Sequence, residues 1–256
     1  MMTKKPLLSG LFALGLCLCT QSLTAQNTDS ASVEPKYRPF DVSASIKNKH
    51  LWRGYIVADV PVLTASATVT TKDKNLQFGL WSGNGFNGEY KEFCYFLNYH
   101  IKNFDITLLD SFNYTGFSDA KIFDYNKSST RHFIDVNLAY HFSEKFPLTV
   151  SLATVVQGRD TFIDSNGKLK NRFSHYAELD YKVYEEGDTN VHLYMGGAFS
   201  FVTHDTFYSS SPGIVNVGVT VNKKIHFGKY AVPVFVQGMW NPNHNKATLG
   251  LGVQLF

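Results

Sequence analysis

Hydrophobic and polar residues alternate along most of the chain from Phe40 onward. In the clearest segment, one face carries Phe93, Tyr95, Leu97, Tyr99 and Ile101, and the other carries Glu92, Cys94, Phe96, Asn98 and His100. A period of two places neighbouring side chains on opposite faces of an extended strand. Twelve such runs predict twelve strands, at 42–47, 63–70, 76–81, 92–101, 104–108, 134–142, 148–156, 173–183, 191–201, 215–222, 232–236 and 247–255. After Leu108 the alternation stops, so the side on which Leu109 lies is ambiguous. This indicates either a bulge or the end of a strand that extends beyond the apolar part of the sheet.

The links between these runs alternate in length. With the N-terminus on the periplasmic side, short links fall at 72–75, 102–103, 143–146, 185–189 and 223–229, and longer ones at 115–130, 158–171 and 202–213. Short periplasmic turns and long outer loops are typical of outer-membrane barrels, whose strands of about 9 to 11 residues cross the bilayer at a tilt. The predicted fold is therefore all-β, a closed antiparallel transmembrane β-barrel of about 12 strands. A soluble secreted β protein is an alternative, because soluble sandwiches also alternate.

The N-terminus has the features of a secretory signal. Lys4 and Lys5 precede an apolar stretch at 7–19, and Ala25 fits a cleavage site. We expect a signal peptide at 1–25, a periplasmic lead-in at 26–39 and the outer-membrane barrel at 40–256, in a Gram-negative bacterium. Removing the signal takes away two lysines and no acid, so the formal net charge of +3 falls to +1 and gives no reason to expect a nucleic-acid partner.

The cysteines and sequence motifs give little evidence of a disulfide, a catalytic site or a metal site. After removal of the signal only Cys94 remains of the three cysteines, so an internal disulfide is excluded and Cys94 is expected to be buried. No hydrolase, zinc-protease or phosphate-loop motif is present. His132 and Asp135 would lie on opposite faces of one strand, and so would Ser174 and His175. We therefore expect no catalytic residues, no metal site and no cofactor, and the protein is predicted not to be an enzyme.

The polar faces of the strands would line the barrel interior. This set contains Lys47, Lys49, Arg53, Glu92, Asn98, His100, Asp135, Asn137, His141, Gln157, Glu178, Asp180, Lys182, Asn216, Thr220 and Gln237. Buried charges must be hydrated or paired with one another. The candidate selectivity residues are Arg53, Glu92, Asp135, Glu178, Asp180 and Lys182. Bulky inward residues favour a narrow lumen, namely Trp81, Phe96, Phe133, Tyr176, Tyr194 and Phe235.

Several stretches carry a family resemblance. They are KNKHLWRGY (Lys47 to Tyr55) in the first strand, HFSEKFPLTVSLATVVQG (His141 to Gly158), RFSHYAELDYKV (Arg172 to Val183), GIVNVGVTVNKKI (Gly213 to Ile225) and VPVFVQGMWNPN (Val232 to Asn243). The chain resembles the TorF-like porins of Gram-negative outer membranes, in the form found in Bacteroides-type bacteria. The resemblance implies an outer-membrane location and a barrel fold, and it supplies no catalytic residues.

The expected function is a narrow porin-like channel for small polar or ionic solutes. The inward acids favour a mild cation preference, which Lys47, Lys49 and Lys182 could cancel. The alternative is a structural or surface-interaction barrel whose lumen is filled by side chains, and a barrel enzyme is a weaker one. The expected partners are outer-membrane lipid, small polar solutes and, during biogenesis, the barrel-assembly machinery.

Overall fold

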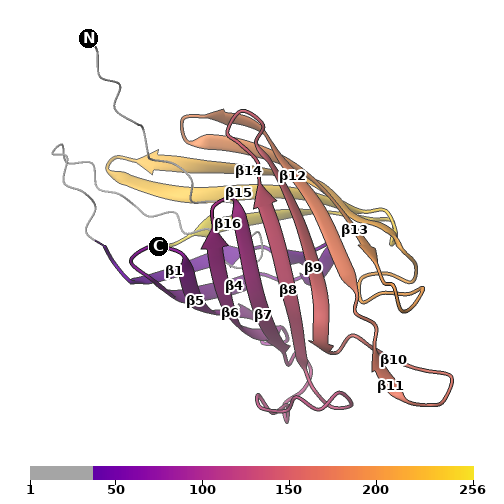
Figure 1. Cartoon of the computed structure of the whole chain (residues 1–256). Helices are drawn as coiled ribbons and strands as arrows, with labels where there is room; N and C mark the ends of the chain where they lie inside the picture. Colours follow the sequence, from indigo (N-terminus) through magenta and orange to yellow (C-terminus); the bar gives the residue numbers. More distant parts are fainter. Residues whose placement is uncertain (1–36) are drawn as a thin grey trace.

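The computed structural model describes residues 37–256, and the predicted signal peptide lies outside them. Twelve strands form one closed antiparallel barrel (Figure 1), which confirms the predicted fold class. They are β1 (Phe40–Lys47), β4 (Val62–Thr70), β5 (Leu76–Gly85), β6 (Lys91–Ile101), β7 (Phe104–Asn113), β8 (His132–His141), β9 (Leu148–Gly158), β12 (His175–Glu186), β13 (Thr189–Phe199), β14 (Gly213–Phe227), β15 (Tyr230–Asn241) and β16 (Lys246–Gln254). Pairing of β1 with β16 closes the barrel. No helical segment able to span a membrane is found in residues 37–256.

The two faces of the wall have opposite polarity. In β4, Leu63 and Val69 are exposed on the outside, whereas Thr64, Ser66 and Thr68 are buried inside. Most of the other strands repeat this arrangement, so the outer face is a belt of exposed hydrophobic side chains. A closed sheet with an apolar exterior and a polar interior is the pattern of a barrel surrounded by lipid.

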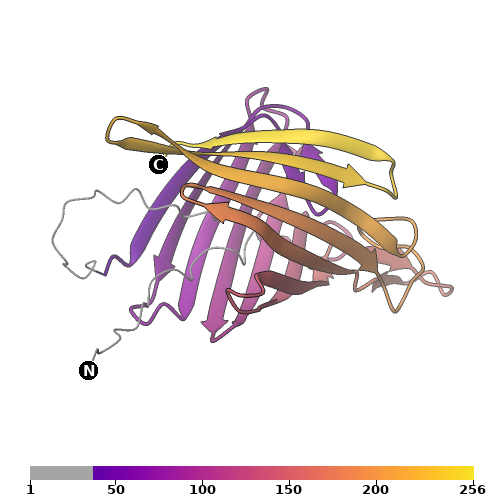
Figure 2. The ribbon, with the colours of Figure 1, turned by 90° about the horizontal axis from the view of Figure 1, so that it is seen from above.

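The two ends of the barrel differ in the length of their connections (Figure 2). One end, here called the short-turn end, carries the links 71–75, 102–103, 142–147, 187–188 and 228–229. The other, the long-loop end, carries 48–61, 86–90, 114–131, 159–174, 200–212 and 242–245. The link predicted at 223–229 is mostly strand, because β14 and β15 continue pairing as far as Phe227 and Tyr230.

The prediction that Lys47 to Tyr55 belong to the first strand is wrong. Strand β1 ends at Lys47, which pairs with Val62 at the start of β4. The intervening chain forms β2 (His50–Trp52) and β3 (Tyr55–Ala58), a hairpin that packs inside the barrel. Its turn is formed by Arg53 and Gly54, with φ angles of 43° and 84°. Two successive residues with positive φ are what a tight hairpin turn requires. We call residues 48–61 the inner hairpin.

Two bulges change which residues face the lumen. The pairing of β13 with β14 shifts between Gly196 and Gly197, and Val215, expected to face lipid, is instead fully buried against Tyr208 and Tyr176. The pairing of β8 with β9 shifts between Ile134 and Asp135. As a result Gln157, expected inside, pairs across from Ile134 and donates to the Tyr125 carbonyl oxygen (3.3 Å). An added residue in one strand reverses the side-chain alternation beyond it.

Loop 114–131 folds back over the outer wall of β6 to β8. Tyr125 stacks on His132 with ring centroids 4.1 Å apart, and the two ring nitrogens of His132 bond the Asp110 carboxylate (2.7 Å) and the Ile122 carbonyl (2.8 Å). Strand β7 pairs with both neighbours without a register shift, so there is no bulge at Leu109. The hydrophobic pattern is ambiguous there because this end of β7 is covered by the loop. His132 is thereby outside the wall, and Asp135 is inside, as the sequence predicts.

Candidate functional site

A buried ion pair holds the inner hairpin to the barrel wall. Arg53 Nη1 lies 2.5 Å from Asp135 Oδ2 and donates to the Tyr208 hydroxyl at 2.7 Å. Arg53 is 7% exposed and Asp135 is 0% exposed. The guanidinium also lies over the Trp52 ring, 4.8 Å from its centroid. A buried pair of this kind fixes geometry, because separating it would leave an uncompensated charge. We call this contact the Arg53–Asp135 anchor.

Further hydrogen bonds hold the hairpin and loop 200–212 together within the lumen. The Tyr55 hydroxyl donates to the Phe207 carbonyl (2.6 Å), and Asn241 Nδ2 donates to the Gly54 carbonyl (3.0 Å). The Phe207 amide in turn donates to Ser174 Oγ (2.7 Å), whose hydroxyl donates to Asp160 (2.8 Å). Burial raises the pKa of Asp160, against the effect of the Ser174 donors. The long-loop end is therefore narrowed by ordered chain.

The inward face of β12 carries three of the predicted site residues in one row. Glu178 accepts hydrogen bonds from the Tyr176 hydroxyl and from Asn216 Nδ2 (3.1 Å). Asp180 bonds His192 Nδ1 at 2.7 Å, and Lys182 pairs with Glu185 near the short-turn end. The alternation predicted for this strand thus places all three inside, each with a partner on the wall.

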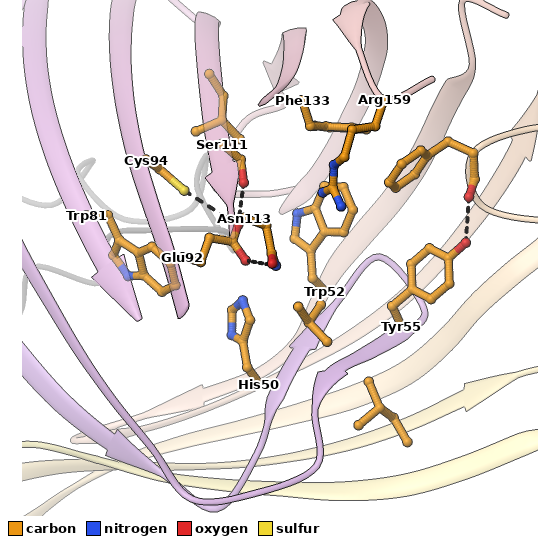
Figure 3. A pocket seen from close by; sticks show the side chains of 14 residues that line it. His50, Trp52, Tyr55, Trp81, Glu92, Cys94, Ser111, Asn113, Phe133 and Arg159 are labelled. Carbon is orange, nitrogen blue, oxygen red and sulfur yellow. Dashed lines mark hydrogen bonds between the residues drawn. The ribbon is translucent and has the colours of Figure 1, made fainter. Parts of the chain in front are cut away.

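A cavity of about 220 Å³ lies between the inner hairpin and the wall formed by β5 to β8 (Figure 3). Its apolar lining includes Trp52, Trp81, Phe133 and Phe207, and its charged residues are Glu92 and Arg159. The aromatic rings come from the hairpin, from two strands and from loop 200–212. We call this space the hairpin cavity.

The two charged residues of the hairpin cavity differ in how they are satisfied. The Glu92 carboxylate accepts from the Ser111 hydroxyl, from Asn113 Nδ2 (2.9 Å) and from the Tyr90 hydroxyl (2.8 Å), and Cys94 Sγ lies 3.6 Å away. The Arg159 side chain donates no hydrogen bond to any residue in 37–256. Its guanidinium lies 5.9 Å from the Phe207 ring centroid. Glu92 is therefore held by the wall, whereas the Arg159 guanidinium has no hydrogen-bond partner among residues 37–256.

Four inward aromatic rings lie over glycines of the neighbouring strand. A Cβ atom added at the glycine would collide with the ring in each of the pairs Phe96 over Gly79, Tyr176 over Gly196, Tyr194 over Gly218 and Phe235 over Gly252. These residues face inward as predicted from the sequence. Since the rings lie along the wall, they take less of the lumen than their size alone would indicate.

The structure joins some of the predicted site residues and separates others. Arg53 and Asp135 contact each other, Glu178, Asp180 and Lys182 form one row, and Glu92 lies in the hairpin cavity. Sequence reasoning missed Arg159, because it follows the β9 bulge and fell within a predicted long loop. Within residues 37–256, no group of three or more His, Cys, Asp and Glu side chains could hold a metal ion.

Comparison with solved structures returns outer-membrane proteins. The NanC porin has a TM-score of 0.47 at 9% identity, covering 84% of this chain and 98% of that one. An outer membrane channel from Pseudomonas putida F1 has a TM-score of 0.45 at 14% identity, covering 89% and 98%. Salmonella typhi OmpF has a TM-score of 0.36 at 11% identity, covering 78% and 63%. No family model matches the chain. No curated protein matches it either.

Proposed function

We propose that this protein is an outer-membrane β-barrel that acts as a narrow channel for small polar or ionic solutes. The observation that carries the proposal is the closed barrel of 12 strands with an apolar exterior and a lumen lined by charged side chains. Twelve strands lie between the eight that side chains can fill and the roughly 16 to 18 that leave a wide aqueous channel. The inner hairpin narrows this lumen further.

The proposal includes a location and a direction. The apolar belt and the alternation of short turns and long loops are typical of the Gram-negative outer membrane, with the short-turn end in the periplasm. A signal peptide at 1–25, assembly by the barrel-assembly machinery and membership of the TorF-like porins belong to the same proposal. No step of it requires an enzymatic activity.

Within the lumen, we assign solute contact to Glu92, Glu178, Asp180 and Lys182, which are not fully buried. Arg53 and Asp135, also predicted as selectivity residues, are assigned to anchoring because they are buried against each other. Fixed charges along a narrow aqueous passage determine which ions enter. In the row on β12, the two acids Glu178 and Asp180 outnumber Lys182, which pairs with Glu185, so the row carries net negative charge and favours cations.

The test is conductance of the purified full-length protein in planar bilayers, combined with liposome swelling in small sugars. We expect discrete channels, and the Glu178→Gln, Asp180→Asn double variant should shift the reversal potential in a salt gradient towards anions. Glu144→Gln, in the exposed turn 142–147, is the matched control and should leave the reversal potential unchanged. A folded protein that passes neither ions nor sugars would support the side-chain-filled structural barrel, with its function in the long loops.

A further inference from the structure

We infer that the hairpin cavity is a binding site for a small carboxylate carried on a flat apolar ring, an aromatic monocarboxylic acid. This inference deepens the proposed channel function, since it names a class of solute held by Arg159 at the long-loop end, apart from the acidic row of β12 that favours cations. It rests on three features of the cavity, which are an arginine with unused donors, a saturated acid and a wall of aromatic rings.

Arg159 provides the anion contact. It follows the last residue of β9 and its side chain points into the cavity beside Trp52 and Phe133 (Figure 3). Its Nε atom is buried without a hydrogen-bond partner within residues 37–256. A guanidinium presents a planar set of donors that matches the two oxygens of a carboxylate, and such charge-assisted pairs are stronger than neutral ones. An unpaired guanidinium in a partly dry cavity is therefore suited to a carboxylate.

Glu92 restricts the ligand to a single negative charge and does not recruit a cation. Ser111, Tyr90 and Asn113 already donate to its two carboxylate oxygens, so few acceptor positions remain for an ammonium group. Its negative charge lies in the same cavity as Arg159 and partly offsets it. A dianion would thus meet repulsion, whereas a monoanion directed at Arg159 would not.

The aromatic walls select the rest of the ligand. The Trp52 and Phe133 rings are edge to face with centroids 5.3 Å apart, and Trp81 and Phe207 contribute further apolar surface to the same cavity. Offset and edge contacts with an aromatic ring are favourable beyond burial alone. The cavity volume of about 220 Å³ lies below the ~300–1,000 Å³ of sites for drug-sized ligands, so one ring fits and a long chain does not. Ser111 and Asn113 are committed to Glu92, so apart from Arg159 the His50 ring is the main polar group left to bind the hydroxyl groups of a sugar ring.

The experiment is calorimetric titration of the detergent-solubilised full-length protein with benzoate, benzamide, benzylammonium and glucuronate. We expect benzoate to bind most tightly, because it alone combines a carboxylate with a flat apolar ring. Arg159→Gln should weaken benzoate binding by about tenfold to a hundredfold, as expected for loss of a charged hydrogen-bond donor. Arg159→Lys should retain part of the affinity, because it keeps the charge.

Two matched variants control for location. Arg38→Gln removes an exposed arginine ahead of β1 at the short-turn end, and Trp240→Leu removes a tryptophan exposed on the outer wall. Neither should change benzoate binding, whereas Trp81→Leu should weaken it. Heat-modifiable migration in gels verifies that each variant is folded.

Any of three results would overturn the inference. Equal binding of benzoate and benzamide, or unchanged benzoate binding in the folded Arg159→Gln variant, would show that Arg159 does not hold a carboxylate. Tighter binding of glucuronate or benzylammonium than of benzoate would reject the assigned ring or charge. Binding is measured independently of conduction. A protein that binds benzoate but conducts no ions would therefore contradict the proposed channel function and still support the binding site.

Discussion

At the scale of residues, the structure distinguishes charges that hold the protein together from charges that face solutes. Arg53 and Asp135 were assigned to the polar interior from the sequence just as Glu178 and Asp180 were, yet the first two are buried against each other. Burial of an ion pair gives modest net stability, but breaking it leaves a charge that is costly to bury. The two classes should therefore respond differently to substitution.

Asp135→Ala should lower the free energy of unfolding by about 3–5 kcal/mol, because the Arg53 guanidinium would remain buried without its partner. Urea unfolding in lipid vesicles measures this change. Asp59→Ala is the matched control, since Asp59 pairs with Lys49 but its side chain is 69% exposed, and its cost should stay below about 1 kcal/mol. Similar costs for the two variants would contradict the anchor.

The glycines under the aromatic rings lead to a second prediction. Gly252→Ala should force the Phe235 ring away from the wall and into the lumen, and single-channel conductance should fall. Gly238→Ala is the control, because a Cβ atom there meets only an ordinary contact with Val219. An unchanged conductance in Gly252→Ala would mean that this ring does not border the conducting path.

At the scale of elements, the inner hairpin is an insertion between two strands that already pair. Lys47 and Val62 are partners in the β1–β4 ladder, so the barrel wall is continuous without residues 48–61. The hairpin contributes Trp52 and Tyr55 to the interior and one side of the hairpin cavity. Removal of the hairpin should therefore widen the lumen and leave the strand pairing of the wall intact.

Replacing residues 48–61 with Asn-Gly should leave a folded barrel with a larger single-channel conductance, since two residues of this kind close a tight turn between paired strands. Planar-bilayer recording measures the conductance, and far-ultraviolet circular dichroism checks the β content. An unaltered conductance would place the narrowest part of the passage away from the hairpin.

The same element shows how far the sequence could be interpreted. The wall strands were predictable because lipid on one side and a polar lumen on the other impose alternation on every strand. Residues 48–58 (NKHLWRGYIVA) do not alternate, and the alternating run of the first strand ends at Lys47. It was the family resemblance that extended this strand to Tyr55, because a short hairpin inside the lumen has no period-two pattern that would identify it. Val215 and Gln157 were misplaced because a single bulge residue reverses the alternation, and hydrophobicity does not mark its position.

The candidate site was predictable only in part for a related reason. The alternation of side chains along a strand placed Glu178, Asp180 and Lys182 on the same face, because all three belong to one strand. Arg53 and Asp135 were both assigned to the interior, but their contact joins segments 82 residues apart and no local pattern encodes it. Arg159 follows the displaced end of β9, where alternation could no longer be used.

At the scale of the whole molecule, the exposed apolar belt determines how the barrel sits in its surroundings. Val217 and Leu251 belong to it, whereas Thr220 of the same strand as Val217 is buried inside. A charge on a lipid-facing position must be moved out of water when the barrel inserts, and a charge in the lumen need not be.

Val217→Arg should therefore reduce the free energy of unfolding by about 2–4 kcal/mol if the position lies near the bilayer midplane, and Leu251→Arg should behave alike. Thr220→Arg, the control on the same strand, should have a smaller effect. Unfolding in lipid vesicles compares the three variants. An equal reduction in the free energy of unfolding for Val217→Arg and Thr220→Arg would contradict the assignment of Val217 to the lipid face and Thr220 to the lumen.

The contacts of the inner hairpin also have a consequence for the order of folding. Arg53, Tyr55 and Gly54 meet partners 82, 152 and 187 residues further along the chain. Contacts between such distant segments carry a large loop-closure cost and form late. The hairpin can thus dock only after β8, loop 200–212 and β15 are in place. Docking of the inner hairpin is therefore a late step of barrel assembly. Until the last strands have assembled, the interior is not narrowed by the hairpin.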